Sequence, residues 1–132
     1  MKIVLNRCFG GFHPSHKAMM RYFELKGIEV GVYEHKYNQP YIKATDTTRE
    51  YDIEYFTGPQ EETIEYDRER YFWYGDIERT DPILVQVVEE LGEEASAPVS
   101  ELKVVYIDDD CTDWYIHDYD GMESVEESHR SW

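Results

Sequence analysis

The fold is decided within one stretch, residues 2–27, "KIVLNRCFGGFHPSHKAMMRYFELKG". Its apolar run at residues 3–5 is continuous, which is typical of a buried strand. The Gly10–Gly11 pair ends this strand, and a helix-forming segment follows it at residues 15–27. The stretch therefore predicts a strand, a glycine turn and a helix in succession.

The predicted helix has clear ends and one apolar face. Ser15 is a suitable N-cap and Gly27 a suitable C-terminal stop, so the helix is expected to run to Lys26. Its apolar side chains are Ala18, Met19, Tyr22 and Phe23. They fall on one side of a helix, so this helix is expected to pack on the body of the protein.

Positive charge is concentrated in the same stretch. Residues 1–27 contain five lysines and arginines against Glu24 alone, which is a net charge of +4. The whole chain has a formal net charge of −16, so residues 28–132 carry −20. If the first segment stays on the surface, such asymmetry predicts a dipolar molecule, which bears on association rather than on fold.

The glycine turn is a candidate anion-binding site. Glycines let backbone N–H groups approach a ligand closely, and a helix N-terminus carries about half a positive charge. The GxxxxGK[ST] and GxGxxG spacings of phosphate and dinucleotide loops are both missing. The candidate ligand-binding residues are Arg7, Gly10, Gly11, Phe12, Ser15, His16, Lys17, His129 and Arg130. The structural alternatives are a tight turn whose serine only caps the helix, and an exposed C-terminus.

Residues 28–80 are rich in tyrosine and in acidic residues, and they predict several short strands. Runs such as "IEVGVYEHKY" and "RYFWYGDI" are separated by turn-forming residues. The alternation in residues 51–55 predicts an antiparallel strand whose wet face carries a wall of acidic side chains. A long excursion without a core pattern is the alternative for this region.

A second helix is predicted over residues 81–95. Asp81 is a suitable N-cap, and Pro82 occupies the first helical position, where its missing N–H costs nothing. One apolar stripe at helical spacing is made by Leu84, Val87, Val88, Leu91 and Ala95. Gly92 marks the point where this helix is expected to stop or fray.

A β-hairpin is predicted in "WYIHDYDGMESVEE", near the end of the chain. Asp120–Gly121 is the preferred pair for a two-residue type I′ turn. In that register Ile116 faces Val125, and Asp118 faces Glu123. Two carboxylates that face each other repel, so the pair is unfavourable unless a positive side chain lies near it.

The order of these elements, with one more strand at residues 101–107, predicts an α+β fold. We expect a mainly antiparallel sheet, two helices packed on one face of it, and a C-terminal β-hairpin. At 132 residues the chain is long enough for one buried core. A single domain, 1–132, is therefore predicted, with residues 28–80 as a strand and loop insertion.

Composition excludes several classes of protein and site. Hydrophobic residues make up 41% and aromatic residues 15%, which is too much for a disordered acidic tail. No apolar run is long enough to span a membrane, and two cysteines make no disulfide framework, so a reduced, intracellular chain is expected. The acidic charge disfavours direct binding to nucleic acid or to anionic membranes. The aspartate-rich segments lack the calcium-loop spacing, so neither a metal site nor a cofactor is predicted.

Four segments carry motifs: "NRCFGGFHPSHKA", "DPILVQVVEELGEEA", "LKVVYIDDD" and "YDGMESVEESHRSW". They resemble a family of small uncharacterised proteins from bacteriophages, prophages and other mobile elements. The resemblance covers residues 1–27 and 79–132. This chain departs from it in having His13–Pro14 inside the first motif, and Asp108 where a proline usually follows the isoleucine. The resemblance implies a viral setting, in the cytoplasm of an infected bacterial host, and antagonism of host defence.

These observations predict a non-catalytic, phage-type binding protein. We expect it to sequester a small anionic, nucleotide-like ligand at the Gly10–Gly11 turn and the first helix N-terminus, as a counter-defence activity. The alternative is an acidic protein that mimics nucleic acid and inhibits a host defence nuclease, as anti-CRISPR proteins do. A small hydrolase using Cys8 or His129 is a third, weaker interpretation. The partner is accordingly a small anionic ligand or a basic host protein, and a homo-oligomer is compatible with the sequence.

Overall fold

The computed structural model describes residues 1–35, 39–48 and 50–127. The helices are α1 (His16–Lys26) and α2 (Pro82–Leu91), with 3₁₀ turns η1 (Glu50–Asp52), η2 (Tyr74–Asp76) and η3 (Gly92–Ala95). The strands are β1 (Lys2–Asn6), β2 (Val30–Glu34), β3 (Tyr41–Lys43), β4 (Ile53–Thr57), β5 (Thr63–Ile64), β6 (Tyr71–Phe72), β7 (Leu102–Tyr106), β8 (Trp114–Tyr119) and β9 (Met122–Glu127).

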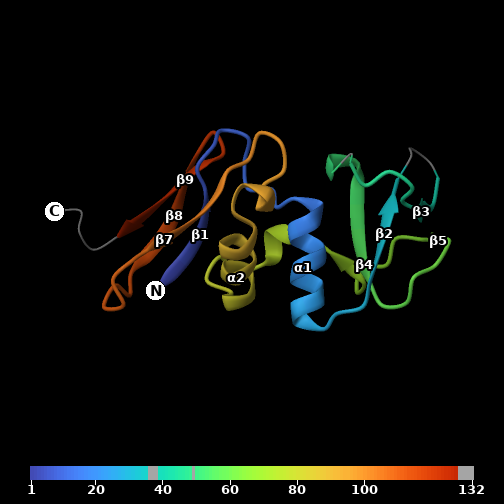
Figure 1. The fold of residues 1–132 in the computed structure, drawn as a ribbon, viewed down its shortest axis with the longest axis horizontal. Coiled ribbons are helices and arrows are strands. Elements are labelled where there is room, and N and C mark those ends of the chain that lie inside the picture. Colours follow the sequence, from blue (N-terminus) through green and yellow to red (C-terminus); the bar gives the residue numbers. More distant parts are fainter. Residues whose placement is uncertain (36–38, 49, 128–132) are drawn as a thin grey trace.

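These elements form layers along an elongated molecule (Figure 1). At one end lie the β8–β9 hairpin and the antiparallel β1–β7 pair. The two helices occupy the middle, and a five-stranded antiparallel sheet of order β5-β3-β2-β4-β6 forms the other end. The predicted α+β class with antiparallel strands and a terminal hairpin is confirmed. The strands are nevertheless divided between the two sides of the helix pair, and they do not form one continuous sheet.

Both helices begin and end where the capping residues predict. The Ser15 side chain accepts from the Ala18 N–H, and Gly27 closes α1 with a left-handed φ of 70°. The Asp81 side chain accepts from the Ile83 N–H, with proline in the first turn of α2. Beyond Gly92 the chain tightens into the η3 turn, so the predicted stripe continues to Ala95 although the α-helix has ended.

The main core is made by α1 and α2 together with β1, β7 and the near face of the five-stranded sheet. Val4 of β1 and Leu102 of β7 enter it from one side, and Ile53 and Tyr55 of β4 from the other. Residues 3–5 of β1 are completely buried, as the continuous apolar run predicts.

The alternation predicted for residues 51–55 is present, since Ile53 and Tyr55 are buried and Glu54 between them is half-buried, but it ends at the next residue, Phe56. Phe56 is completely buried on the face opposite to Tyr55, where it packs with Tyr33 and Ile64 in a second small core. The half-exposed rings of Tyr41 and Tyr71 cover this cluster. Large aromatic side chains on the short neighbouring strands therefore exclude solvent from the face of β4 that carries Phe56. Alternation alone would predict that this face is exposed.

The C-terminal hairpin has the predicted register. Ile116 lies opposite Val125, and Asp118 lies opposite Glu123. Both residues of its turn have positive φ, 50° for Asp120 and 90° for Gly121, as a type I′ turn requires. The hairpin packs on β1, which brings Glu123 to the buried end of that strand.

Candidate functional site

The two glycines of the predicted site lie in close contact with other backbone segments. A Cβ atom on Gly10 would be 1.7 Å from the carbonyl oxygen of Val99. A Cβ atom on Gly121, in the hairpin turn, would be 2.5 Å from the nitrogen of Gly11 and from the carbonyl oxygen of Phe9. The glycine turn is therefore packed between the 97–100 loop and the hairpin turn, which accounts for Gly10 without a ligand.

Asn6, which the sequence interpretation did not single out, fixes this turn by hydrogen bonds. It is completely buried, and its amide nitrogen donates to the carbonyl oxygens of Cys8 (2.5 Å) and Gly121 (2.6 Å). Its side-chain oxygen accepts from the N–H of Glu101 (2.9 Å). One side chain thus satisfies buried backbone groups of three segments that are far apart in the sequence.

The N-terminus of α1 is already occupied by groups of the chain itself. Ser15 is buried, and its hydroxyl donates to the carbonyl oxygen of Glu94 (2.6 Å) while it caps the helix. The backbone N–H of His16 donates to the Glu50 carboxylate (3.1 Å), which comes from η1. An anionic ligand at this position would have to displace Glu50, so sequestration of a nucleotide-like ligand here stays a prediction.

His16 joins the helix start to the five-stranded sheet. Its Nδ1 lies 2.8 Å from the hydroxyl of Tyr55, and the two rings are stacked. Burial lowers the pKa of His16 below its ordinary value of 6.5, although the Glu50 carboxylate acts in the opposite direction. The neutral imidazole is therefore the form that suits the folded protein.

This pKa shift predicts a loss of stability on acidification. Because the pKa of His16 is lower in the folded than in the unfolded chain, the unfolded chain takes up the proton first as the pH falls below 6.5. The free energy of unfolding should be smaller at about pH 5.5 than at about pH 7.5. Urea unfolding at both pH values should show a smaller difference for His16→Gln, and an unchanged difference would contradict this assignment.

The remaining predicted residues have separate partners. Arg7 is exposed, and its guanidinium donates to the carbonyl oxygen of Glu123 (2.9 Å). Phe12 lies under the guanidinium of Arg79, 3.6 Å from ring centroid to the central carbon. Lys17 is ion-paired with Glu94 (3.0 Å).

His129 and Arg130 lie outside the described residues. Arg7 and Phe12 are thus brought together beside the Arg79–Glu123 pair, while Ser15, His16 and Lys17 lie together at the start of α1.

The Arg79–Glu123 ion pair is the most enclosed charged group near the turn, and sequence reasoning missed Arg79. Two nitrogens of the guanidinium lie 2.5 and 2.9 Å from the two carboxylate oxygens. The exposed fraction of the Glu123 side chain is 5%, and that of Arg79 is 17%. The sequence contained one indication of this ion pair. Asp118 and Glu123 face each other in the predicted hairpin, and their repulsion required a positive side chain nearby.

The positive charge of the N-terminal stretch is largely cancelled by α2 and the residues that flank it. Lys17 pairs with Glu94, Arg21 with Glu90 (3.0 Å), and Lys26 with Asp81 (3.1 Å), while Lys2 of β1 pairs with Glu89 (3.0 Å). Three of these pairs join α1 to α2 and to the residues on either side of it, and the fourth joins β1 to α2. Most of the positive side chains in residues 1–27 are therefore already paired with carboxylates of the chain and are not free to bind an anionic ligand.

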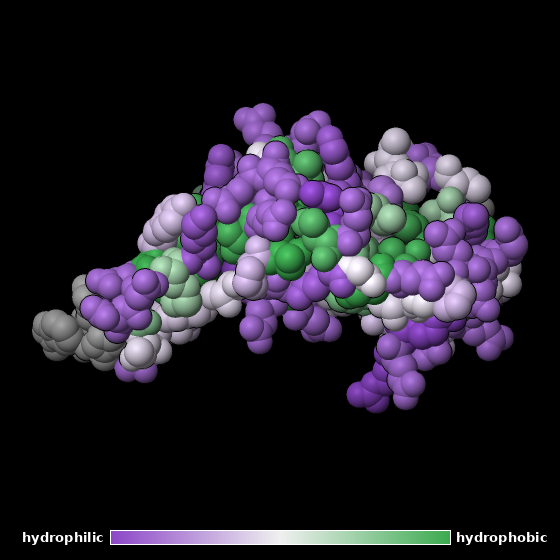
Figure 2. Space-filling view, turned by 60° about the horizontal axis from the view of Figure 1, so that its bottom comes forward, coloured by the Kyte–Doolittle hydropathy of each residue, from purple (hydrophilic) through white to green (hydrophobic). Residues whose placement is uncertain are grey.

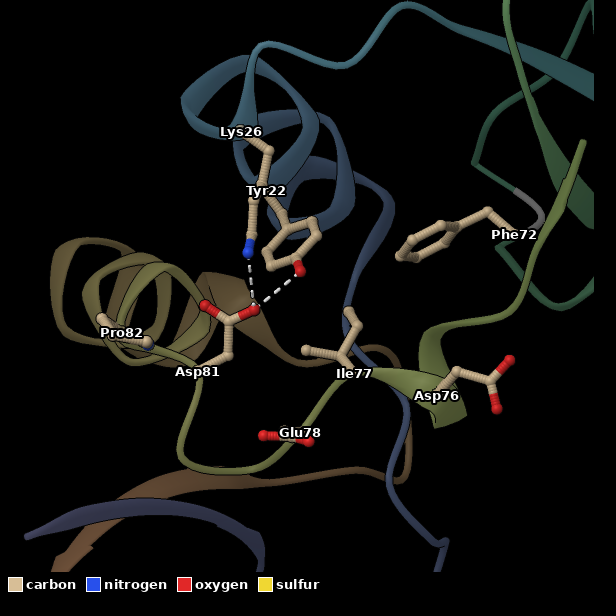
Figure 3. Close-up of a pocket in the computed structure, with 8 residues that line it drawn as sticks. All are labelled: Tyr22, Lys26, Phe72, Asp76, Ile77, Glu78, Asp81 and Pro82. Atoms are coloured by element: carbon tan, nitrogen blue, oxygen red, sulfur yellow. Dashed lines mark hydrogen bonds and ion pairs between the residues drawn. The ribbon is translucent and has the colours of Figure 1, made fainter.

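A cavity of about 400 Å³ lies between α1, β6 and the start of α2 (Figure 3). It is lined by Tyr22, Lys26, Phe72, Asp76, Ile77, Glu78, Asp81 and Pro82. The Asp81 carboxylate accepts from the Tyr22 hydroxyl (2.8 Å) and pairs with Lys26, and these donors lower the pKa of Asp81 against the effect of its burial. Burial and the same carboxylate raise the pKa of Tyr22, so its hydroxyl stays a hydrogen-bond donor.

Other classes of site find no support in the described part of the chain. No group of three or more His, Cys, Asp or Glu side chains there is arranged to hold a metal ion. None of the helices in residues 1–35, 39–48 and 50–127 has the length and apolarity that a membrane crossing requires. Comparison of the chain with protein-family models, curated proteins and solved structures gives no match.

Proposed function

We propose that this chain is a non-catalytic acidic binding protein that occupies the basic, nucleic-acid-binding surface of a partner protein. One observation carries the proposal: the chain neutralises its own cations and leaves its excess carboxylates at the surface. Of 13 lysines and arginines, Lys36, Arg49 and Arg130 lie outside the described residues. Seven of the other ten make ion pairs with carboxylates of the chain.

Exposed tyrosines among these carboxylates support a protein partner. Tyr66 is 59% exposed between Glu65 and Asp67, and Tyr119 is 67% exposed between Asp118 and Asp120. Tyrosine is favoured at binding hot spots because a rigid ring adds contact area at a small cost in entropy. Carboxylates and rings together can take the places of phosphates and stacked bases.

The motifs that resemble phage and prophage proteins favour a particular setting for this activity. A phage protein that occupies the nucleic-acid groove of a host defence nuclease would act as its inhibitor. Binding would then be driven by long-range attraction and would weaken as salt screens it.

Charge reversal at three positions between β4 and β6 tests the proposal. Glu62, Glu65 and Glu69 are exposed, and they make no ion pair with any cation of the described residues. We expect the Glu62→Lys, Glu65→Lys, Glu69→Lys variant to inhibit DNA binding by a panel of RNA-guided nucleases at least about tenfold more weakly than the original chain. Competition with labelled duplex DNA measures this, at about 50 and about 200 mM salt.

The glutamine version of the same three positions serves as the matched control. It removes half as much charge, so its inhibition should lie between that of the original chain and that of the lysine variant. The proposal would be contradicted if inhibition changed neither with the salt concentration nor with the substitutions. It would also be contradicted if the chain bound none of the nucleases tested. Thermal melting of the three proteins establishes that they are equally folded.

A further inference from the structure

Two carboxylates at the cavity of Figure 3 have no cation among the described residues to neutralise them. Asp76 and Glu78 are exposed, and no ion pair or side-chain hydrogen bond joins their carboxylates to any other described residue. Asp76 lies on the side of Phe72, and Glu78 lies on the side of Asp81 (Figure 3). Three acidic residues, Asp76, Glu78 and Asp81, therefore line the cavity together with one lysine, and the excess negative charge favours a further cation there.

The walls between these carboxylates are aromatic and apolar. The rings of Tyr22 and Phe72 point toward each other, with centroids 6.1 Å apart, and Ile77 lies below them (Figure 3). Figure 2 shows a strip of hydrophobic residues in the middle of one face, surrounded by hydrophilic ones. A volume of about 400 Å³ lies within the range for binding pockets, so it has room for a side chain as large as arginine.

The protein already places one of its own cations in this way. The Lys26 ammonium lies 3.1 Å from Asp81 and 5.5 Å from the centroid of the Tyr22 ring. A cation is therefore held between a carboxylate and a ring at one end of the cavity. The Phe72 side of the cavity offers a second ring, and the lining residues Asp76 and Glu78 add carboxylates that no cation of the described residues neutralises.

We propose that this cavity binds an arginine side chain of the basic partner. The inference rests on the proposed function and names the group by which the partner is recognised. A guanidinium is planar, stacks on aromatic rings and donates two parallel hydrogen bonds to a carboxylate. A lysine ammonium is compact and more strongly hydrated, so it gains less from the rings.

A pair of fluorescent peptides tests the inference on the full chain. A hexa-arginine and a hexa-lysine peptide carry equal charge, so a general acidic surface binds both alike. We expect the arginine peptide to bind about fivefold more tightly. Glu78→Gln and Asp76→Asn should each reduce this preference, and Phe72→Leu should bring the two affinities close together. Thermal melting establishes that each variant is folded.

Methyl resonances locate the peptide. In protein labelled at isoleucine methyl groups, the Ile77 resonance should shift on addition of the arginine peptide, while that of Ile116 in the hairpin should not. Glu126→Gln, on the exposed side of the hairpin, is the matched control and should keep the preference for arginine.

The outcomes separate this inference from the proposed function. If both peptides bind with salt-dependent but equal affinity and the Ile77 resonance does not move, the cavity assignment is wrong and the acidic binding protein stands. If neither peptide binds at about 50 mM salt, both are contradicted, because an acidic surface made for a basic partner must attract hexa-arginine.

Discussion

Replacing Glu123 with alanine should lower the free energy of unfolding by about 3 to 5 kcal/mol. The substitution leaves the guanidinium of Arg79 largely buried and without its carboxylate partner, 2.5 and 2.9 Å away in the folded protein. It also removes the acceptor of the Asn6 backbone N–H, which is 2.8 Å from the same carboxylate. Urea unfolding monitored by tryptophan fluorescence measures the loss.

Two further variants show where the energy comes from. Glu126→Ala, on the exposed side of the same strand, should change the free energy of unfolding by less than about 0.5 kcal/mol. The double variant Arg79→Met, Glu123→Leu should recover much of the loss, because a buried ion pair often contributes no more than well-packed apolar side chains do. If Glu123→Ala costs no more than Glu126→Ala, the ion pair does not hold the hairpin on the body.

The features that the sequence predicts correctly are those encoded within a few residues. The caps at Ser15 and Asp81, the stop at Gly27 and the Asp120–Gly121 turn each depend on local backbone chemistry. The register of the hairpin follows directly from its turn. The helix faces follow from apolar spacing, because a side chain four residues along returns to the same side.

What could not be predicted depends on contacts between distant segments. The β1–β7 pair joins residues about 100 positions apart, and no local pattern specifies which strand β1 will meet. The second core needs Tyr33, Phe56 and Ile64 to meet from three strands, although each fits an ordinary exposed strand by itself.

The same limit applies to the candidate site. The candidate residues in the first 17 positions are neighbours in the sequence, but their partners come from residues 50, 79, 94 and 123. Charge counting treated the five N-terminal cations as available, whereas carboxylates of α2 and of the residues that flank it pair with four of them. The cavity joins α1, β6 and the start of α2, so no single stretch of sequence contains its chemistry.

Replacing Gly10 with alanine should destabilise the protein by about 3 kcal/mol, because the added methyl group overpacks a closed contact. The new Cβ atom would lie 1.7 Å from the carbonyl oxygen of Val99, so the 97–100 loop would have to move as a unit. Gly11→Ala is the matched control. Its φ of 89° strains an alanine, but apart from its two chain neighbours no described residue has an atom within 4 Å of the new methyl group, so a loss of about 1 kcal/mol is expected.

The contrast between the two variants distinguishes packing from ligand binding as the reason for the glycine pair. Val99→Gly should not rescue Gly10→Ala, because the closest obstructing atom belongs to the backbone of residue 99 and is present in any residue there. Because glycine also relieves the strain of valine at a φ of 61°, the test compares Val99→Gly in both backgrounds, and a larger gain in Gly10→Ala than in the original chain would mean that the Val99 side chain makes the contact. If Gly10→Ala instead unfolds at the same urea concentration as the original chain, packing does not require this glycine. Close approach of the turn to an anionic ligand would then be the better explanation for the pair.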